Sequence, residues 1–316
     1  MADALLSIAH LAKAYGALKV TDDLSLDIPE GELHAIIGPN GAGKTTLIRQ
    51  LAGSIPSDAG RIVFAGRDIT RTSVPARVRL GLARSFQITS ILAGFTVLEN
   101  VALAVQARSG SSFRFWGRVA DEAALNGPAM AALADVGLAH RARTRASLLS
   151  HGEKRQLEIA LALATGPRLL LLDEPLAGVG REESAALVAL LAALRGRLTI
   201  VLVEHDMDAV FQLAERISVL VYGRVVATGT AAQIRDNAEV RTAYLGEEAS
   251  LCCWLSRAAR RSTATARSST ASASRSTPAR SWRCSAATAW ARRRRSARCS
   301  ASCRRSAGAS YSTAST

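Results

Sequence analysis

A glycine-rich segment near the N-terminus limits what this chain can fold into. Residues 38–45 read GPNGAGKT and fit the pattern G-x-x-x-x-G-K-[ST]. The segment follows an apolar stretch at 33–37 and precedes a helical pattern at 44–52, which is the context this pattern requires. Its glycines let the backbone turn with its N–H groups inward, and the helix N-terminus adds partial positive charge. An ordinary glycine-rich turn is the alternative, but with strand and helix in place the segment predicts a phosphate-binding loop.

The loop predicts specific ligands for ATP and for Mg²⁺. Lys44 is expected to reach the β- and γ-phosphates, and the hydroxyl of Thr45 is expected to bind Mg²⁺. Backbone N–H groups would hold other phosphate oxygens. The candidate nucleotide-binding residues in this segment are Gly38, Asn40, Gly41, Gly43, Lys44, Thr45 and Thr46.

An apolar strand pattern at 169–172 ends in two carboxylates, Asp173 and Glu174. In a parallel sheet, Asp173 would lie at the carboxyl edge, near the Mg²⁺ of the loop. Glu174 is then placed to act as general base on the attacking water. Acidic residues often end strands for other reasons, so this pair takes its meaning from the loop that precedes it.

The remaining patterns indicate an α/β fold, in which a parallel or mixed sheet is flanked by helices. We further expect strands at 61–64 and 198–203, a turn at 65–68, a helix at 182–194 and a hairpin of 217–222 with 225–228 about Gly223. From about 95 to 150, Ala, Leu and Arg predominate and β-branched runs are few. This stretch predicts a helical subdomain inserted between core strands.

A third motif lies shortly before the acidic strand. Residues 149–153 read LSHGE and lead into a helical pattern. Ser150 and the backbone of Gly152 can face a phosphate at the start of that helix, although a capped amphipathic helix beginning at Ser150 would look the same. The stretch resembles the signature motif of ABC ATPases, whose usual form is Leu-Ser-Gly-Gly-Gln, so His151 and Glu153 are departures.

Three single residues strengthen the resemblance to ABC ATPases by their order along the chain. Gln87 resembles the glutamine that senses Mg²⁺ and the attacking water, His205 the histidine that contacts the γ-phosphate, and Tyr15 the aromatic that stacks on adenine. Alone, each would more often be a surface or packed residue. The resemblance covers residues 4–248 as one ATPase domain with an antiparallel β part near its N-terminus. It implies catalytic roles for Glu174, His205 and Gln87, and it makes Gln87 a further Mg²⁺ ligand.

Within this family the chain looks most like the subunits that drive import of branched-chain amino acids. The segments that carry this likeness are 81–87 (GLARSFQ), 96–101 (TVLENV) and 241–247 (RTAYLGE). The likeness implies an ATPase at the cytoplasmic face of the cell membrane, with transmembrane permease subunits, a second ABC ATPase subunit and a solute-binding protein as partners. Similar ATPases serve urea uptake and lipopolysaccharide export, so urea and lipopolysaccharide are alternative transported substrates. One departure is Gly180, where the family often has an aspartate.

By this resemblance, two such subunits close head to tail. Each ATP then lies between the glycine-rich loop of one subunit and Ser150 and Gly152 of the other. Hydrolysis removes that bridge, and the opening is passed to the permease through the groove around Gln87 and the helical insert.

The net charge of +14 does not indicate nucleic acid as a partner, because of where the charge lies. Residues 250–316 hold 14 of the 40 basic residues and none of the 26 acidic ones, so the preceding residues are neutral overall. A soluble ABC ATPase that acts on nucleic acid is therefore the weaker alternative. No uninterrupted apolar stretch reaches about 20 residues, so contact with a membrane is expected through a partner.

Residues 249–316 form a Ser-, Ala- and Arg-rich tail. The tail is predicted to be disordered, because it offers little apolar surface to offset its ordering entropy. Its arginine run at 292–295 could bind anionic lipid or nucleic acid. We favour a frameshift as its origin, since codons can be chosen for 281–294 that encode a second glycine-lysine loop in another reading frame. The genomic DNA of this region decides between these interpretations.

Overall fold

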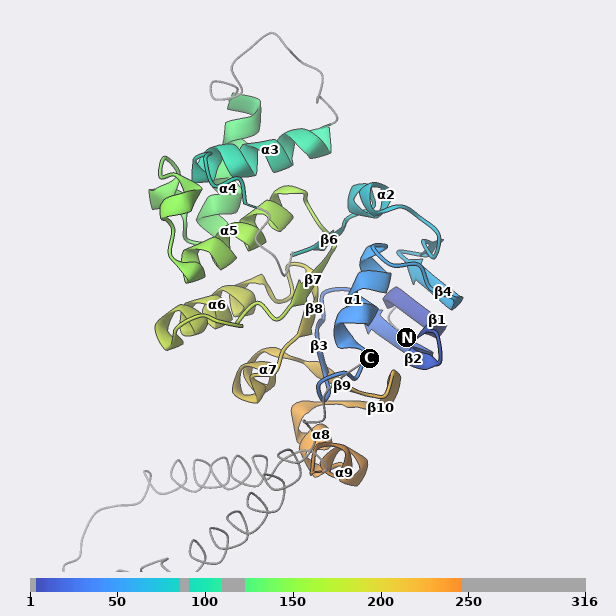
Figure 1. Ribbon diagram of the computed structural model, residues 1–316. Helices are drawn as coiled ribbons and strands as arrows, with labels where there is room; N and C mark the ends of the chain where they lie inside the picture. Colours follow the sequence, from blue (N-terminus) through green and yellow to red (C-terminus); the bar gives the residue numbers. More distant parts are fainter. Residues whose placement is uncertain (1–3, 86–90, 110–122, 246–316) are drawn as a thin grey trace, which may run out of the picture. The chain divides into compact units, whose positions relative to one another are not determined.

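The computed structural model describes residues 4–85, 91–109 and 123–245 of the 316-residue chain (Figure 1). Within these ranges the chain forms two β-sheets with helices packed on their faces. Gln87, part of the predicted helical insert and the tail predicted at 249–316 lie outside the described residues.

The smaller sheet is antiparallel and comes from the N-terminal part of the chain. Its order is β2-β1-β4-β5, with β1 (Ala4–Tyr15), β2 (Leu18–Pro29), β4 (Ala59–Phe64) and β5 (Arg67–Asp68). Alternation places Leu24, Leu26 and Ile28 of β2 in the core, the pattern of a sheet with one buried face. The antiparallel β part that the family resemblance implies is therefore present.

The larger sheet has six strands in the order β10-β9-β3-β8-β7-β6, and only β10 runs antiparallel to its neighbour. Its strands are β3 (Leu33–Ile37), β6 (Leu82–Arg84), β7 (Leu169–Asp173), β8 (Thr199–Val203), β9 (Arg216–Val221) and β10 (Arg224–Gly229). Every residue of β3, β7 and β8 is buried, as continuous apolar runs predict for strands covered on both faces. Val203 is in register with both Asp173 and Ile36, so these three strands end at the same edge.

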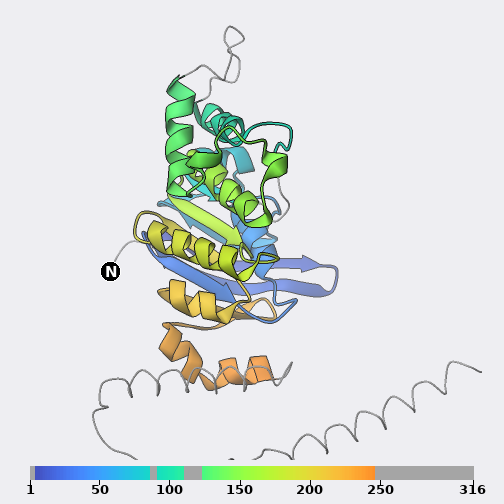
Figure 2. The same ribbon diagram turned by 90° about the vertical axis from the view of Figure 1, so that its left-hand side faces the viewer.

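Helices cover both faces of the larger sheet (Figures 1 and 2). On one face, α1 (Lys44–Ala52) lies between the two sheets, and its Leu47 and Leu51 share an apolar cluster with β1 and β2. The other face is covered by α5 (His151–Ala164), α6 (Arg181–Leu194) and α7 (Met207–Leu213). The hairpin of β9 and β10 leads into α8 (Ala231–Asp236) and α9 (Ala238–Leu245).

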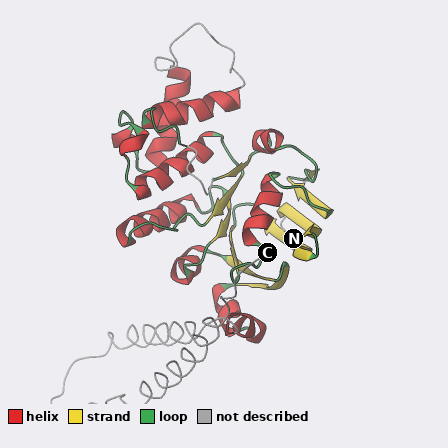
Figure 3. Ribbon diagram, viewed as in Figure 1, coloured by secondary structure: helices red, strands yellow, loops and turns green. Residues whose placement is uncertain are grey.

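A group of helices is inserted between β6 and β7 (Figure 3). It contains α3 (Val97–Ser109), α4 (Ala123–Asp135) and two 3-10 turns at Ala139–Arg141 and Ala146–Leu148, and it leads into α5. Val101 of α3 and Leu133 of α4 are fully buried and share an apolar cluster with Leu157 of α5. The inserted helical part of the predicted fold is thus confirmed. No helix in the described ranges is both long and apolar enough to cross a membrane.

The hairpin after β4 is tighter than the sequence pattern predicts. The turn expected at 65–68 consists only of Ala65 and Gly66, which have positive φ angles of 50° and 75°, as two-residue hairpin turns require. The following two residues form β5 instead, and Arg61 Nε donates to Asp68 across the hairpin at 2.7 Å. This ion pair supports strand pairing where the sequence pattern predicts a turn.

One buried arginine ties the C-terminus of α1 to the next helix. Arg77 lies in α2 (Val74–Arg79) and is only 2% exposed. Its guanidinium donates to the carbonyl oxygens of Gln50 at 2.8 Å, of Leu51 at 2.5 Å and of Thr70 at 3.1 Å. The last carbonyls of a helix lack partners four residues ahead, and a cation there also meets the negative end of the helix dipole. Arg77 therefore caps the helix that begins at the glycine-rich loop.

We expect Arg77→Lys to lower the free energy of unfolding by about 1–3 kcal/mol, because a lysine ammonium cannot reach several carbonyls at once and leaves some unsatisfied. Urea denaturation followed by circular dichroism measures this change. Arg79→Lys, at an exposed position of the same helix, is the matched control and should change stability by less than about 0.5 kcal/mol. Equal effects of the two variants would contradict the capping role of Arg77.

Candidate functional site

The glycine-rich loop lies between β3 and α1 and packs closely against two other strands. A Cβ atom on Gly43 would lie 2.3 Å from the carbonyl oxygen of Val20, and one on Gly38 would lie 2.1 Å from that of Leu220. Gly41 and Gly43 also have positive φ angles of 80° and 100°, which residues with side chains disfavour. Glycine is therefore required for the loop to turn in this space.

Lys44 and the two threonines that follow it form the first turn of α1. The Lys44 side chain is buried, and its Nζ donates to two carbonyl oxygens of the loop at 2.7 and 2.9 Å. These bonds hold the ammonium against the loop whose N–H groups are predicted to bind phosphate. Thr45 and Thr46 are half-buried, and Asn40 is exposed.

Asp173 ends β7 as a buried carboxylate that is only partly satisfied. Its Oδ2 accepts a hydrogen bond from Arg84 Nη2 at 3.2 Å, whereas its Oδ1 has no partner among the described residues. Burial raises the pKa of Asp173, while the positive charge of Arg84 opposes that shift. Arg84 ends the neighbouring strand β6, and its own pKa is lowered by burial. The site therefore contains an acceptor that the residues in the described ranges leave unused.

The free oxygen of Asp173 fits a divalent cation. Mg²⁺ prefers hard oxygen ligands such as carboxylates and hydroxyls, and α1, which carries the Thr45 hydroxyl, contacts β7. A bound Mg²⁺ would supply positive charge against the phosphates of a nucleotide. The donor set of the described residues thus suits this ion.

Glu174 and His205 form a pair at the carboxyl edge of the larger sheet. Glu174 Oε1 lies 2.5 Å from His205 Nε2, and the two residues follow the neighbouring strands β7 and β8. Glu174 has a φ of 54°, and its backbone N–H donates to the carbonyl oxygen of Val203 at 2.9 Å. Left-handed backbone is unfavourable for a residue with a side chain and is concentrated at functional sites. Both side chains are partly exposed, so water can reach the carboxylate.

Glu204 supports this pair, although no motif in the sequence marks it as a site residue. The residue is 3% exposed, and its carboxylate accepts the backbone N–H of Leu176 at 2.7 Å and of His205 at 3.1 Å. Burial raises the pKa of Glu204, and these backbone bonds oppose the shift. The carboxylate thereby links the start of the His205 segment to the loop after Glu174. A buried acidic residue directly after a buried strand was the available signal.

Ser150 and Gly152 begin α5, in the helical part of the chain. Ser150 Oγ accepts the backbone N–H of Glu153 at 3.2 Å, and the Glu153 carboxylate accepts the N–H of Ser150 at 2.9 Å. This is a capping box, so the capped helix considered as an alternative is present. Arg141 Nε holds Glu153 at 2.8 Å and is the leading cause that lowers its pKa. The cap leaves Ser150 exposed at the helix N-terminus, so it does not exclude phosphate binding.

Tyr15 ends β1 at the hairpin with β2. Its side chain is half-exposed, and Lys13 Nζ lies 5.4 Å from the ring centre. The following strand carries Val20, whose carbonyl abuts Gly43 of the loop, so this hairpin adjoins the loop. Gln87, the third predicted catalytic residue, lies outside the described ranges.

The arrangement defines a class of protein. A glycine-lysine loop, a buried carboxylate with a free oxygen and a glutamate-histidine pair meet at the carboxyl edge of one mostly parallel sheet. These are the parts of a P-loop nucleotide hydrolase, in which the chemistry depends on positioning and charge rather than on a covalent intermediate.

Comparison with known proteins narrows this class. A family model described as "ABC transporter" matches residues 21–177, and one described as "Branched-chain amino acid ATP-binding cassette transporter" matches residues 224–250. The high-affinity branched-chain amino acid transport ATP-binding protein LivG of Escherichia coli K12 is 37% identical over 259 residues, which cover 78% of this chain and 100% of LivG. The lipopolysaccharide export system ATP-binding protein LptB of Haemophilus influenzae is 33% identical, covering 77% and 98%.

A solved structure supports the same assignment. The ADP conformation of MJ1267, an ATP-binding cassette of an ABC transporter, is 28% identical with a TM-score of 0.69, covering 78% of this chain and 100% of that one. This chain belongs to the family of ABC transporter ATP-binding proteins and is an ATP hydrolase of that family. The resemblance noted in the sequence is thereby confirmed.

We expect Glu204→Gln to lower ATP turnover by about tenfold or more, because an amide replaces one of the two acceptors that hold Leu176 and His205, and small displacements of catalytic groups are costly. Steady-state ATPase kinetics measure this loss, and fluorescent-nucleotide titration should give an unchanged dissociation constant. Glu215→Gln, an exposed carboxylate after the next helix, is the control. Full turnover in Glu204→Gln would show that the backbone bonds of Glu204 do not position His205.

Proposed function

We propose that this chain binds Mg²⁺ and ATP and drives a branched-chain amino acid importer as its nucleotide-hydrolysing subunit at the cytoplasmic face of the cell membrane. The observation that carries the nucleotide part is the free Oδ1 of Asp173 beside the Glu174–His205 pair. The relatives named for branched-chain amino acid transport support the solute.

Different residues of the site bind the phosphates, the Mg²⁺ ion and the adenine of ATP in this proposal. Lys44 neutralises the β- and γ-phosphates, while the N–H groups around Gly41 and Gly43 wrap them. Thr45 and Asp173, together with Gln87, hold Mg²⁺. The remaining loop residues Gly38, Asn40 and Thr46 complete the cradle, and Tyr15 stacks on the adenine.

Hydrolysis depends on a proton acceptor at Glu174. In the structure its Oε1 is engaged by His205 Nε2 at 2.5 Å. If His205 turns to a terminal phosphate, Oε1 becomes free to accept a proton from the attacking water. Gln87 positions that water. The pair thus links recognition of the phosphate to activation of the base.

A second ABC ATPase subunit completes each site in this proposal. Ser150 and Gly152 lie at the N-terminus of a 14-residue helix, where a hydroxyl and the positive end of the helix dipole attract an anion. A facing subunit would present its bound nucleotide to them. The two subunits then close around ATP and open after hydrolysis.

We expect Glu174→Gln to keep ATP binding but to lower turnover by about 100-fold or more, because loss of a general base typically costs 10²–10⁴ in rate. The variant should accumulate as an ATP-bound dimer, with itself or with a sister ATPase that co-purifies. Light scattering after gel filtration measures the dimer, and phosphate release measures turnover. Glu182→Gln, which neutralises an exposed carboxylate on α6, should behave as wild type. Near-normal hydrolysis by Glu174→Gln would refute the assignment of the base.

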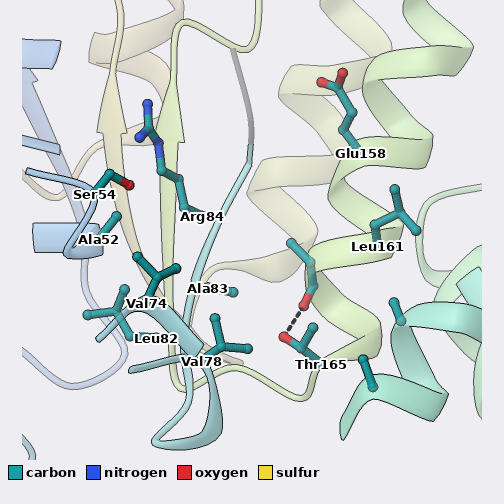
Figure 4. A pocket seen from close by; sticks show the side chains of 13 residues that line it. Ala52, Ser54, Val74, Val78, Leu82, Ala83, Arg84, Glu158, Leu161 and Thr165 are labelled. Atoms are coloured by element: carbon teal, nitrogen blue, oxygen red, sulfur yellow. Dashed lines mark hydrogen bonds between the residues drawn. The ribbon is translucent and has the colours of Figure 1, made fainter. Parts of the chain in front are cut away.

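An apolar pocket offers a docking place for the permease (Figure 4). It has a volume of about 290 Å³ and lies where α1, α2 and β6 face α3 and α5. Its lining residues are Ala52, Ser54, Val74, Val78, Leu82, Ala83, Arg84, Ala104, Ala107, Glu158, Leu161, Ala162 and Thr165. Small and aliphatic side chains predominate, so a helical segment of the permease with an apolar tip fits this surface.

Glu158 gives this pocket a polar anchor. Arg155 donates to its Oε2 at 2.8 Å, whereas its Oε1 has no partner among the described residues although the side chain is buried. Burial raises the pKa of Glu158. If the side chain turns toward the pocket, a hydrogen-bond donor on the permease would satisfy that oxygen and fix the orientation of the docked segment.

One alternative to branched-chain amino acids as the transported substrate is supported by a likeness to another transport ATPase. The likeness to LptB favours lipopolysaccharide export as the second candidate. The match of the branched-chain amino acid model to residues 224–250, which include α8 and α9, favours the importer. An importer of this kind would also require a solute-binding protein. Nucleic acid is not a partner in this proposal, since the charges of residues 1–249 balance.

We propose that the chain consists of one ATPase domain and one appended segment. Residues 4–248 would form the ATPase domain, with its helical subdomain at about 95–150. Residues 249–316 would be an appended segment without a role in hydrolysis. Removing that segment should therefore leave ATP turnover unchanged.

Membrane vesicles that contain the complex with its permease should take up radiolabelled leucine, isoleucine or valine when supplied with ATP. We expect Ala107→Trp to abolish this uptake and the co-purification of the permease, because the indole fills the pocket at an exposed lining position. Basal ATP turnover of the isolated chain should stay within about twofold of wild type, since surface substitutions away from structural features have small effects.

Ala131→Trp is the control, because it adds the same side chain at an exposed position of α4 outside the pocket. Loss of uptake in both variants would show that the pocket is not the docking place of the permease. Export of a lipid in place of amino acid uptake would overturn the solute assignment.

A further inference from the structure

The side chain of Glu183 contacts both the signature stretch at 149–153 and the turn at Gly180. Its Oε1 accepts a hydrogen bond from Ser150 Oγ at 2.9 Å. Its Oε2 accepts the backbone N–H of Gly180 at 3.4 Å. The carboxylate therefore joins Ser150, the N-cap residue of α5, to the turn that precedes α6, and helices α5 and α6 lie side by side (Figures 1 and 2).

The same side chain covers Gly152. A Cβ atom on Gly152 would lie 2.6–2.7 Å from the Cβ, Cγ and Cδ atoms of Glu183, which is closer than real side chains approach. Only glycine leaves room for Glu183 at this position. Glu183 thus covers both residues to which the proposed function assigns a nucleotide from a facing subunit.

The side chain carries a negative charge in this position. Hydrogen bonding from Ser150 is the leading cause that lowers the pKa of Glu183; burial opposes this shift, and the N–H groups of Gly180 and Gly152 lower the pKa further. At neutral pH an anion therefore already occupies the N-terminus of α5, where a phosphate anion would be most favourable.

A serine hydroxyl has one proton to donate. Ser150 Oγ donates its O–H hydrogen bond to Glu183, and a lone pair of the same oxygen accepts the N–H of Glu153. The hydroxyl cannot also donate to a phosphate without breaking the bond to Glu183. Two anions on the same turn would in addition repel each other.

We propose that Glu183 is a latch on the signature stretch, which the terminal phosphate of a nucleotide on a facing subunit must displace before two subunits close. This inference rests on the proposed function, since it requires ATP at the interface of two ATPase subunits. Glu183 acts through Ser150 and is a positioning residue rather than a catalytic one.

Through its hydrogen bond to Glu183, the turn at Gly180 would also respond to phosphate binding at Ser150. When Ser150 Oγ donates its hydrogen bond to the phosphate instead, the contact with Glu183 is lost, and the hydrogen bond from the N–H of Gly180 to Glu183 is broken or changes its geometry. The turn belongs to the loop 174–180, which starts at the proposed base. Nucleotide arriving from the facing subunit is thereby sensed at Gly180, where the family often has an aspartate and this chain has none.

The test uses the full chain in a Glu174→Gln background, so that ATP binds without turnover. The ATP concentration that gives half-maximal dimer is measured by light scattering, with the sister ATPase added if the chain pairs with one. Adding Glu183→Gln should lower this concentration by about two- to tenfold, because a neutral amide holds Ser150 less tightly than a carboxylate does and does not repel phosphate. Glu182→Gln removes the same charge one residue away and should leave it unchanged.

Two further readouts separate a latch from a structural cap. Glu183→Asp keeps the charge but shortens the side chain, so that it releases Ser150 and should also lower the ATP requirement. The affinity of the monomer for a fluorescent ATP analogue should stay the same in all variants, since the contacts of Glu183 are with Ser150, Gly152 and Gly180. Thermal unfolding of each variant identifies any loss of folded protein.

Glu183→Gln needing the same ATP concentration as Glu182→Gln, or more, would overturn the latch while leaving the proposed function intact. Absence of an ATP-dependent dimer in Glu174→Gln itself would instead remove the proposed function, and the latch with it.

Discussion

The parallel register of β3, β8 and β7 is the constraint on which the site depends. Because Val203 is level with both Ile36 and Asp173, the residues that follow these strands emerge together at one edge. The glycine-rich loop, Glu174 and His205 reach this edge from three distant parts of the chain. Burial of the strands on both faces holds the register, since a slip of one residue would exchange the side chains that face α1 with those that face α6.

Much of this arrangement could be predicted from short segments of sequence. The bounds of β3 and α1 follow because a glycine-rich loop separates a continuous apolar run from a helix, and both bounds agree with the structure. The inserted helical part follows from its composition. The predicted roles of the site residues remain predictions, and Gln87 lies outside the described ranges. Glu204 was missed because its partner Leu176 lies 28 positions earlier, a distance that no local pattern encodes.

The departures in the signature stretch have a physical account. Glu153 stands where the family usually has glutamine, and it serves here as one half of a capping box and as the ion-pair partner of Arg141. A glutamine could cap the helix but could not form the ion pair. His151 begins the helix on its exposed side, where substitutions are tolerated. The N-terminus of α5 therefore remains a capped helix start although two of its residues differ from the usual family motif.

Helix α1 connects the glycine-rich loop to the apolar pocket. It begins with Lys44 at the glycine-rich loop and ends at Ala52, which lines the apolar pocket. Nine helical residues span about 13 Å, and such a rod transmits displacement with little bending. Arg77 fastens its far end to α2, whose Val74 and Val78 also line the pocket. A displacement of the glycine-rich loop along this helix would therefore reach the walls of the apolar pocket.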